Sequence, residues 1–99
     1  LYISNFFGNK IHIIDTEKGE IVKEIEGVKT PEEAVLSKDE NILYVVSFDL
    51  SEVYVYDAVT LEKKSISYET GNKPIGVMPV GNKLYVSNYG DNSISIINK

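Results

Sequence analysis

Apolar and polar residues alternate along most of the chain in short runs. The clearest runs lie at residues 11–15, 53–57 and 94–98, where β-branched residues recur at alternate positions. Such a period of two is typical of half-buried β-strands, and helical spacing fits these runs poorly. Polar segments rich in Gly, Asn, Asp and Lys separate the apolar runs, as turns do. The pattern therefore predicts an all-β protein.

The strand pattern repeats every 41–42 residues. Leu-Tyr-Ile-Ser-Asn at residues 1–5 recurs as Leu-Tyr-Val-Val-Ser at 43–47 and as Leu-Tyr-Val-Ser-Asn at 84–88. An aromatic residue and a small polar loop follow each copy and lead into one of the alternating runs. These runs end in Asp15, Asp57 and Asn98, and we expect the two aspartates to accept backbone N–H bonds in the turns that follow.

Two further strands complete each repeat. Residues 20–25 correspond to residues 61–68, and residues 31–36 correspond to residues 74–80. A four-stranded antiparallel meander of this size cannot bury both faces alone, so copies have to stack on one another, radially in a propeller or linearly in a solenoid. Four strands in about 40 to 45 residues favour the propeller. The predicted fold is therefore all-β, with β-propeller blades that repeat every 41–42 residues.

Residues 1–99 form a single, incomplete propeller segment in this interpretation. Repeat 1 covers residues 1–30 and lacks its first strand, repeat 2 covers residues 31–73, and repeat 3 covers residues 74–99 and lacks its last strand. A closed propeller needs about four blades or more. We therefore expect either the rest of a longer chain or self-association to close it; two copies would make a six-bladed ring. The third interpretation is that the chain is a stable proteolytic or partial remnant of a larger protein.

The third repeat resembles the YVTN β-propeller repeat. That pattern has a Tyr-Val-x-Asn strand, a short loop with asparagine, and a Val/Ile strand that ends in aspartate; residues 84–88 and 91–98 follow it. The first repeat matches nearly as well, whereas the middle repeat has Ser47 in place of asparagine and a different loop at residues 48–52. The resemblance implies a propeller, commonly of about seven blades, of the kind found in surface-layer and other secreted or periplasmic proteins. It also implies an extracellular, cell-surface or periplasmic location, and a relation in form to lactonase-like and haem-carrying propellers.

Composition excludes several classes of function. The 99 residues carry a net charge of −5, and all ten positive charges are lysines. The absence of arginine argues against nucleic acid as a partner, because bidentate guanidinium contacts usually hold the phosphate backbone. The chain has no cysteine, which removes disulfides and thiolate metal sites. No apolar run approaches the roughly 18 residues of a membrane span.

The predicted loops of one propeller face offer candidate ligand-binding residues. Loops between second and third strands, and links between blades, gather on the face around the central channel, where propellers usually bind ligands. The candidates there are Asn5, Thr30, Glu32, Asn72, Lys73 and Asn88. For Asn5 and Asn88, hydrogen bonding to nearby backbone in the turns is the stronger expectation.

Repeated aromatic residues are predicted to pack between blades rather than to bind a cofactor, because bulky rings fill the taper between sheets. They form two sets, one with Tyr2, Tyr44 and Tyr85 and the other with Phe6, Phe48 and Tyr89.

No catalytic, metal or cofactor site is predicted. His12 is the only histidine and aligns with Tyr54 and Ser95, so we expect a variable packing or surface position. Carboxylates such as Glu24 and Glu33 are interpreted as solvated surface. The motifs of nucleophilic hydrolases and of nucleotide-binding loops are missing.

Two hypotheses about function follow. The first is a non-enzymatic repeat module that acts as a binding or cell-surface scaffold for protein, peptide or glycan. The alternative is part of a lactonase-like propeller hydrolase whose catalytic residues lie in blades outside this sequence.

Overall fold

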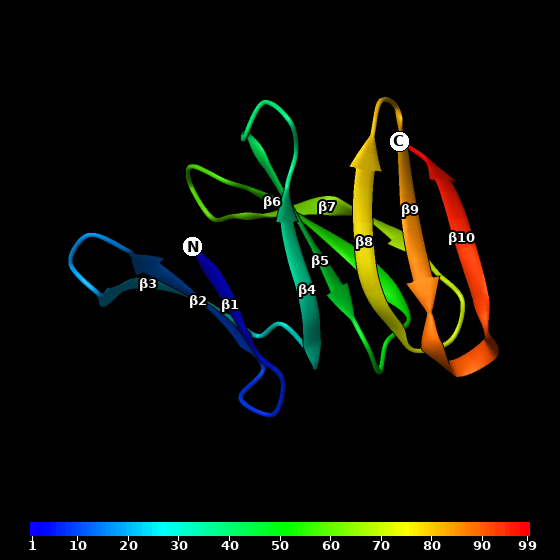
Figure 1. The fold of residues 1–99 in the computed structure, drawn as a ribbon, viewed down its shortest axis with the longest axis horizontal. Helices are drawn as coiled ribbons and strands as arrows, with labels where there is room; N and C mark the ends of the chain where they lie inside the picture. Colours follow the sequence, from blue (N-terminus) through cyan, green and yellow to red (C-terminus); the bar gives the residue numbers. More distant parts are fainter.

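Three antiparallel β-sheets, stacked side by side, make up the structure (Figure 1), a computed structural model that describes all of residues 1–99. The strands are β1 (Tyr2–Asn5), β2 (Lys10–Asp15), β3 (Glu20–Glu26), β4 (Pro31–Leu36), β5 (Ile42–Ser47), β6 (Glu52–Asp57), β7 (Lys63–Glu69), β8 (Pro74–Val80), β9 (Lys83–Asn88) and β10 (Ser93–Asn98). Each sheet is a meander, and we call β1–β3 blade 1, β4–β7 blade 2 and β8–β10 blade 3. The predicted all-β fold of stacked antiparallel meanders is confirmed. The one helix is the three-residue 3-10 turn η1 (Tyr89–Asp91), and no helix is long or apolar enough to cross a membrane.

The hairpins β1–β2, β5–β6 and β9–β10 share one loop geometry. Four residues connect the paired strand ends, and the fourth loop residue has a left-handed backbone in every blade: Asn9, Ser51 and Asn92 all have φ of 54°. Asparagine tolerates this conformation better than most residues do, and serine adopts it at some cost. The three loops therefore have the same backbone path although their sequences differ.

The turns that follow β2 and β6 are capped by aspartate, as predicted. The Oδ1 atom of Asp15 accepts hydrogen bonds from the backbone N–H groups of Glu17 and Lys18 at 3.0 and 3.1 Å. Asp57 does the same for Val59 and Thr60 at 2.8 and 2.9 Å. The N–H groups of Thr60 and Val59 stabilise the ionised carboxylate and lower the pKa of Asp57.

The fourth strand of blade 2 begins later than the alternating pattern predicts. We expected it to start at residue 61, but Leu61 has φ of 65° and belongs to the turn capped by Asp57. Strand β7 therefore starts at Lys63. Side-chain alternation does not report a left-handed backbone, which is why the sequence pattern misplaced this boundary.

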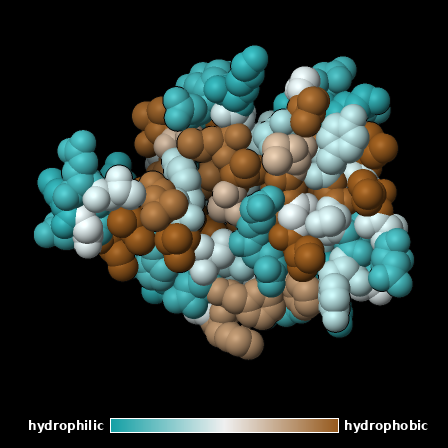
Figure 2. Space-filling model, viewed as in Figure 1, coloured by the Kyte–Doolittle hydropathy of each residue, from teal (hydrophilic) through white to brown (hydrophobic).

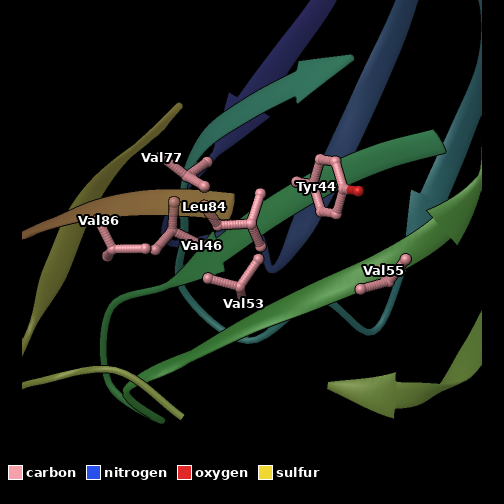
Figure 3. Close-up of a cluster of buried hydrophobic side chains, with 7 residues drawn as sticks. All are labelled: Tyr44, Val46, Val53, Val55, Val77, Leu84 and Val86. Carbon is pink, nitrogen blue, oxygen red and sulfur yellow. The ribbon is translucent and has the colours of Figure 1, made fainter. Parts of the chain in front are cut away.

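Strand β5 lies at the centre of the core because it is buried on both faces. Its side chains alternate, so that Leu43 and Val45 point toward blade 1 while Tyr44 and Val46 point toward blade 3. Figure 3 shows Val46 close to Leu84 and Val86 of blade 3. The cluster between blades 2 and 3 contains Tyr44, Val46, Val53, Val55, Val77, Leu84 and Val86. The cluster between blades 1 and 2 contains Ile11, Ile25, Val28, Leu43, Val45 and Tyr56.

The predicted interblade role of the repeated tyrosines is confirmed for Tyr44, whereas it is not tested for Tyr85, whose side of blade 3 faces no other blade of this chain. Tyr44 is 5% exposed, whereas Tyr85, at the same place in blade 3, is 39% exposed. Tyr85 shares its face with Ile94 and Ile96, and no strand of this chain covers that face. Figure 2 shows that hydrophobic side chains also reach the surface over the other blades.

Candidate functional site

Five chain segments meet at one end of the molecule, the lower end in Figure 1. Backbone hydrogen bonds join each link between blades to the hairpin loops on either side: Val28 N–H to Asn9 O, Phe48 N–H to Thr30 O, Thr70 N–H to Ser51 O, and Tyr89 N–H to Lys73 O. The loop face expected from the repeat is therefore a continuous, hydrogen-bonded layer of loops.

The junction between blades 1 and 2 on this face is closed. The Asn9 side-chain oxygen accepts a hydrogen bond from the Thr30 N–H at 2.9 Å, and the Thr30 hydroxyl accepts one from the Asp49 N–H at 2.9 Å. The ring of Phe6 packs edge-on against the ring of Phe48, with 5.4 Å between centroids. Thr30 is only 8% exposed as a result.

The junction between blades 2 and 3 is open, and a cleft of about 740 Å³ lies there. Its lining residues come from the β5–β6 loop, the β7–β8 link and the β9–β10 loop: Asp49, Ser51, Asn72, Lys73, Tyr89, Gly90 and Asn92. No cleft forms at the equivalent place between blades 1 and 2.

Two substitutions between repeats explain why this cleft stays open. Ser51 occupies the position of Asn9, and its shorter side chain makes no bond to the link. Lys73 occupies the position of Thr30, with φ of 52° where Thr30 has 38°. The Lys73 Nζ atom extends over the ring of Phe48, 5.7 Å from its centroid, instead of capping the next loop.

The backbone around the cleft is held in place by its own hydrogen bonds. The carboxylate of Asp91 accepts a bond from the Asn72 N–H at 3.0 Å, and the Asn72 carbonyl accepts one from the Gly90 N–H at 2.9 Å. The Ser93 hydroxyl, followed by the Asn72 N–H, lowers the pKa of Asp91, so this carboxylate is an anion at neutral pH. The cleft is therefore preformed.

The six predicted site residues do not lie together. Asn72 and Lys73 line the cleft, whereas Thr30 belongs to the closed junction between blades 1 and 2. Glu32 lies on β4, and its carbonyl oxygen accepts a hydrogen bond from the Ser4 hydroxyl.

Asn5 and Asn88 take up different local roles. The Asn5 side-chain oxygen accepts a hydrogen bond from the Gly8 N–H at 2.9 Å, which is the expected turn contact. Asn88 is only 3% exposed, and its Nδ2 donates to the hydroxyls of Ser93 and Ser95 at 3.1 and 2.9 Å. Its Oδ1 atom is buried without a partner.

Four polar or aromatic residues of the cleft are not among the candidates predicted from the sequence: Asp49, Ser51, Tyr89 and Asn92. Tyr89 was assigned to packing between blades, but it is 68% exposed. The available signal was the departure of the middle repeat from the YVTN loop pattern at residues 48–52, because that departure supplies Asp49 and Ser51.

The expectation that Glu33 is only solvated surface is wrong. Its Oε1 atom accepts a hydrogen bond from the Val77 N–H at 2.8 Å, which joins the first strands of blades 2 and 3. The residues lie 44 positions apart in the chain, so no local pattern reveals the bond.

His12 forms a small polar group on blade 1, outside the cleft. Its Nδ1 atom lies 3.1 Å from the Glu24 carboxylate, and its Nε2 atom lies 3.3 Å from Asn5 Nδ2. Lys10 Nζ is 3.5 Å from the same carboxylate oxygen. Glu24 is therefore paired rather than simply solvated.

Comparisons with known proteins support the fold. The structure is similar to Kuenenia stuttgartiensis hydrazine synthase, with a TM-score of 0.87 and 25% sequence identity over 99% of this chain. It is also similar to the dihydro-heme d1 dehydrogenase NirN in complex with DHE, with a TM-score of 0.74 and 17% identity over 98% of this chain. Both are β-propeller structures. This chain spans 29% and 21% of their lengths. No protein-family model matches the chain, and no curated protein matches it.

Proposed function

We propose that the chain is a non-enzymatic β-propeller module that binds a partner or ligand on its loop face. The observation that carries the proposal is the preformed cleft between blades 2 and 3. The volume of this cleft falls within the range of about 300–1,000 Å³ that is usual for small-ligand sites, and its lining is mostly polar.

The loops that form the cleft are suited to binding because the sheets hold them rigidly. Blades 2 and 3 share a buried apolar cluster, and Glu33 joins their first strands. Loops that vary in sequence on a constant scaffold commonly carry recognition. In this chain the loop backbone repeats while the side chains at each junction differ.

The proposal includes a class of protein and a location. We assign the chain to YVTN-like surface-layer propellers, and hence to an extracellular, cell-surface or periplasmic protein, on the sequence pattern of repeats 1 and 3. The remaining blades come from a longer chain or from further copies, which would cover the apolar face around Tyr85.

A second candidate is a blade segment of a propeller enzyme, of which the lactonase-like hydrolase is the form suggested by the sequence. The observation in its favour is that both similar structures are named as enzymes. In that case the catalytic groups would come from parts of the protein outside these residues.

Backbone-amide NMR on the ¹⁵N-labelled chain tests the proposed function. Titration with a panel of saccharides, dipeptides and lactones should shift amide signals of the loop face, among them Gly90 and Asn92, and leave those of the opposite turns near Asp15 and Asp57 unchanged. Shifts confined to the opposite turns would contradict the proposal. Turnover of a lactone by the complete protein would favour the second candidate.

A further inference from the structure

We propose that the cleft between blades 2 and 3 binds a saccharide, with one face of a pyranose ring on Tyr89 and the hydroxyls on the polar side chains around it. The inference rests on the proposed function, because it names the class of ligand for the same cleft.

Tyr89 provides the stacking surface. Its side chain is 68% exposed, although its backbone is fixed by the hydrogen bond from its N–H to the Lys73 carbonyl at 2.9 Å. Phe48, at the same loop position of blade 2, packs against Phe6 instead. The ring of Tyr89 has no such aromatic partner. One face of a pyranose ring is lined by C–H groups and packs on an aromatic ring as other apolar groups do.

The polar groups of the cleft match the hydroxyls of a sugar. The side chains of Asp49, Ser51, Asn72 and Asn92 make no hydrogen bond within the chain. A sugar hydroxyl both donates and accepts, so it pairs equally with a carboxylate, an amide or another hydroxyl. Lys73 adds a donor at the edge of the cleft.

The backbone of the link that lines the cleft is already hydrogen-bonded within the chain. The N–H and carbonyl of Asn72 are bonded to Asp91 and Gly90, and the carbonyl of Lys73 is bonded to Tyr89. Peptides recognised in an extended form pair with free backbone groups of a strand edge. This cleft instead presents side chains that donate and accept hydrogen bonds, as the hydroxyls of a sugar do.

The closed junction between blades 1 and 2 is an internal comparison. The same loop backbone there buries Thr30 and pairs the Phe6 and Phe48 rings. The open cleft therefore results from the side chains at positions 51, 73 and 89 and is not a general property of the repeat.

NMR titrations with chitobiose, maltose and cellobiose as probes test the inference. At least one disaccharide should shift the amides of Tyr89, Gly90 and Asn92 in a saturable manner. Tyr89→Ala should weaken that binding about tenfold, whereas Tyr89→Phe, which keeps the ring, should stay within about threefold.

A double variant, Ser51→Asn with Lys73→Thr, gives the cleft the residues of the closed junction and should abolish binding. Lys29→Thr is the matched control, because it removes the same charge from an exposed position outside the cleft. The thermal midpoint of each variant shows whether it is folded, and Tyr89→Phe remains informative if the double variant is not.

The outcomes separate the two proposals. If glycylglycine shifts the cleft amides and no disaccharide does, the saccharide inference is overturned and the binding function stands. Disaccharide binding that is unaffected by Tyr89→Ala also overturns the inference. If disaccharides, dipeptides and lactones all leave the loop-face amides unchanged, the inference and the proposed function both fail.

Discussion

Replacing Tyr44 by alanine measures how strongly blades 2 and 3 hold together. Tyr44 is 5% exposed and lies in the cluster that contains Leu84 and Val86 of blade 3 (Figure 3). A tyrosine that buries about 150 Å² at about 25 cal/mol per Å² contributes about 4 kcal/mol. Measured truncations of large aromatic side chains in cores span about 3–5 kcal/mol. We therefore expect Tyr44→Ala to lower the free energy of unfolding by about 3–5 kcal/mol.

The same repeat position in blade 3 supplies the control. Tyr85 is 39% exposed on a face that no strand of this chain covers, so Tyr85→Ala should cost about 1–2 kcal/mol. Tyr44→Phe should cost less than about 1 kcal/mol, because the Tyr44 hydroxyl makes no hydrogen bond. Burial raises the pKa of Tyr44, as expected for a ring in an apolar site.

Urea titration followed by far-UV circular dichroism measures all three variants. A change in midpoint at constant slope reports the change in stability. The account of the core is refuted if Tyr44→Ala costs less than about 1 kcal/mol, or no more than Tyr85→Ala does.

Three further predictions follow from single contacts. Burial raises the pKa of Tyr56 to about 12 from 10.0, so the free energy of unfolding should fall by on the order of 2 kcal/mol as the pH rises from 10 to 12. Tyr56→Phe should remove this alkaline loss of stability, and equal losses in both proteins would contradict the burial of Tyr56. Glu33→Ala should cost about 1 kcal/mol in urea titration through the lost bond to Val77, whereas Glu33→Gln, which keeps an acceptor, should cost about half as much; the reverse order would show that charge rather than the bond matters. Gly71→Ala places a Cβ 2.7 Å from Asn88 Nδ2 and 2.8 Å from Asp91 Oδ2, so it should lower the free energy of unfolding by about 1–3 kcal/mol. Gly19→Ala is the comparison for the effect of a left-handed backbone alone, because a Cβ there meets no atom within 4 Å.

The fold could be predicted from the sequence because its cause is local and repeated. Side chains of a strand alternate between two faces, so a period of two in the sequence identifies strands, and its recurrence every 41–42 residues identifies blades. The start of β7 could not be predicted in this way, because it depends on the backbone conformation of Leu61.

The site could be predicted only in part, because it depends on contacts between blades. The repeat places Asn72 and Lys73 on the loop face, and both line the cleft. The junction between blades 1 and 2 is closed because the Asn9 side chain bonds to the link between those blades, whereas Ser51, at the same position of the next junction, makes no such bond. This difference depends on the length and direction of the side chains in three dimensions. The role of Glu33 likewise needs the distance to Val77, a residue of the next blade.

Nuclear Overhauser contacts between methyl groups of different blades test the central claim, that the three sheets stack face to face as propeller blades. The account predicts contacts from Val46 and Val53 of blade 2 to Val77, Leu84 and Val86 of blade 3, and from Leu43 to Ile11 of blade 1. These contacts would establish how each pair of neighbouring blades packs, and therefore where the loops that form the cleft lie. Strong contacts within each sheet, with none between sheets, would contradict the stacked arrangement and the binding site derived from it.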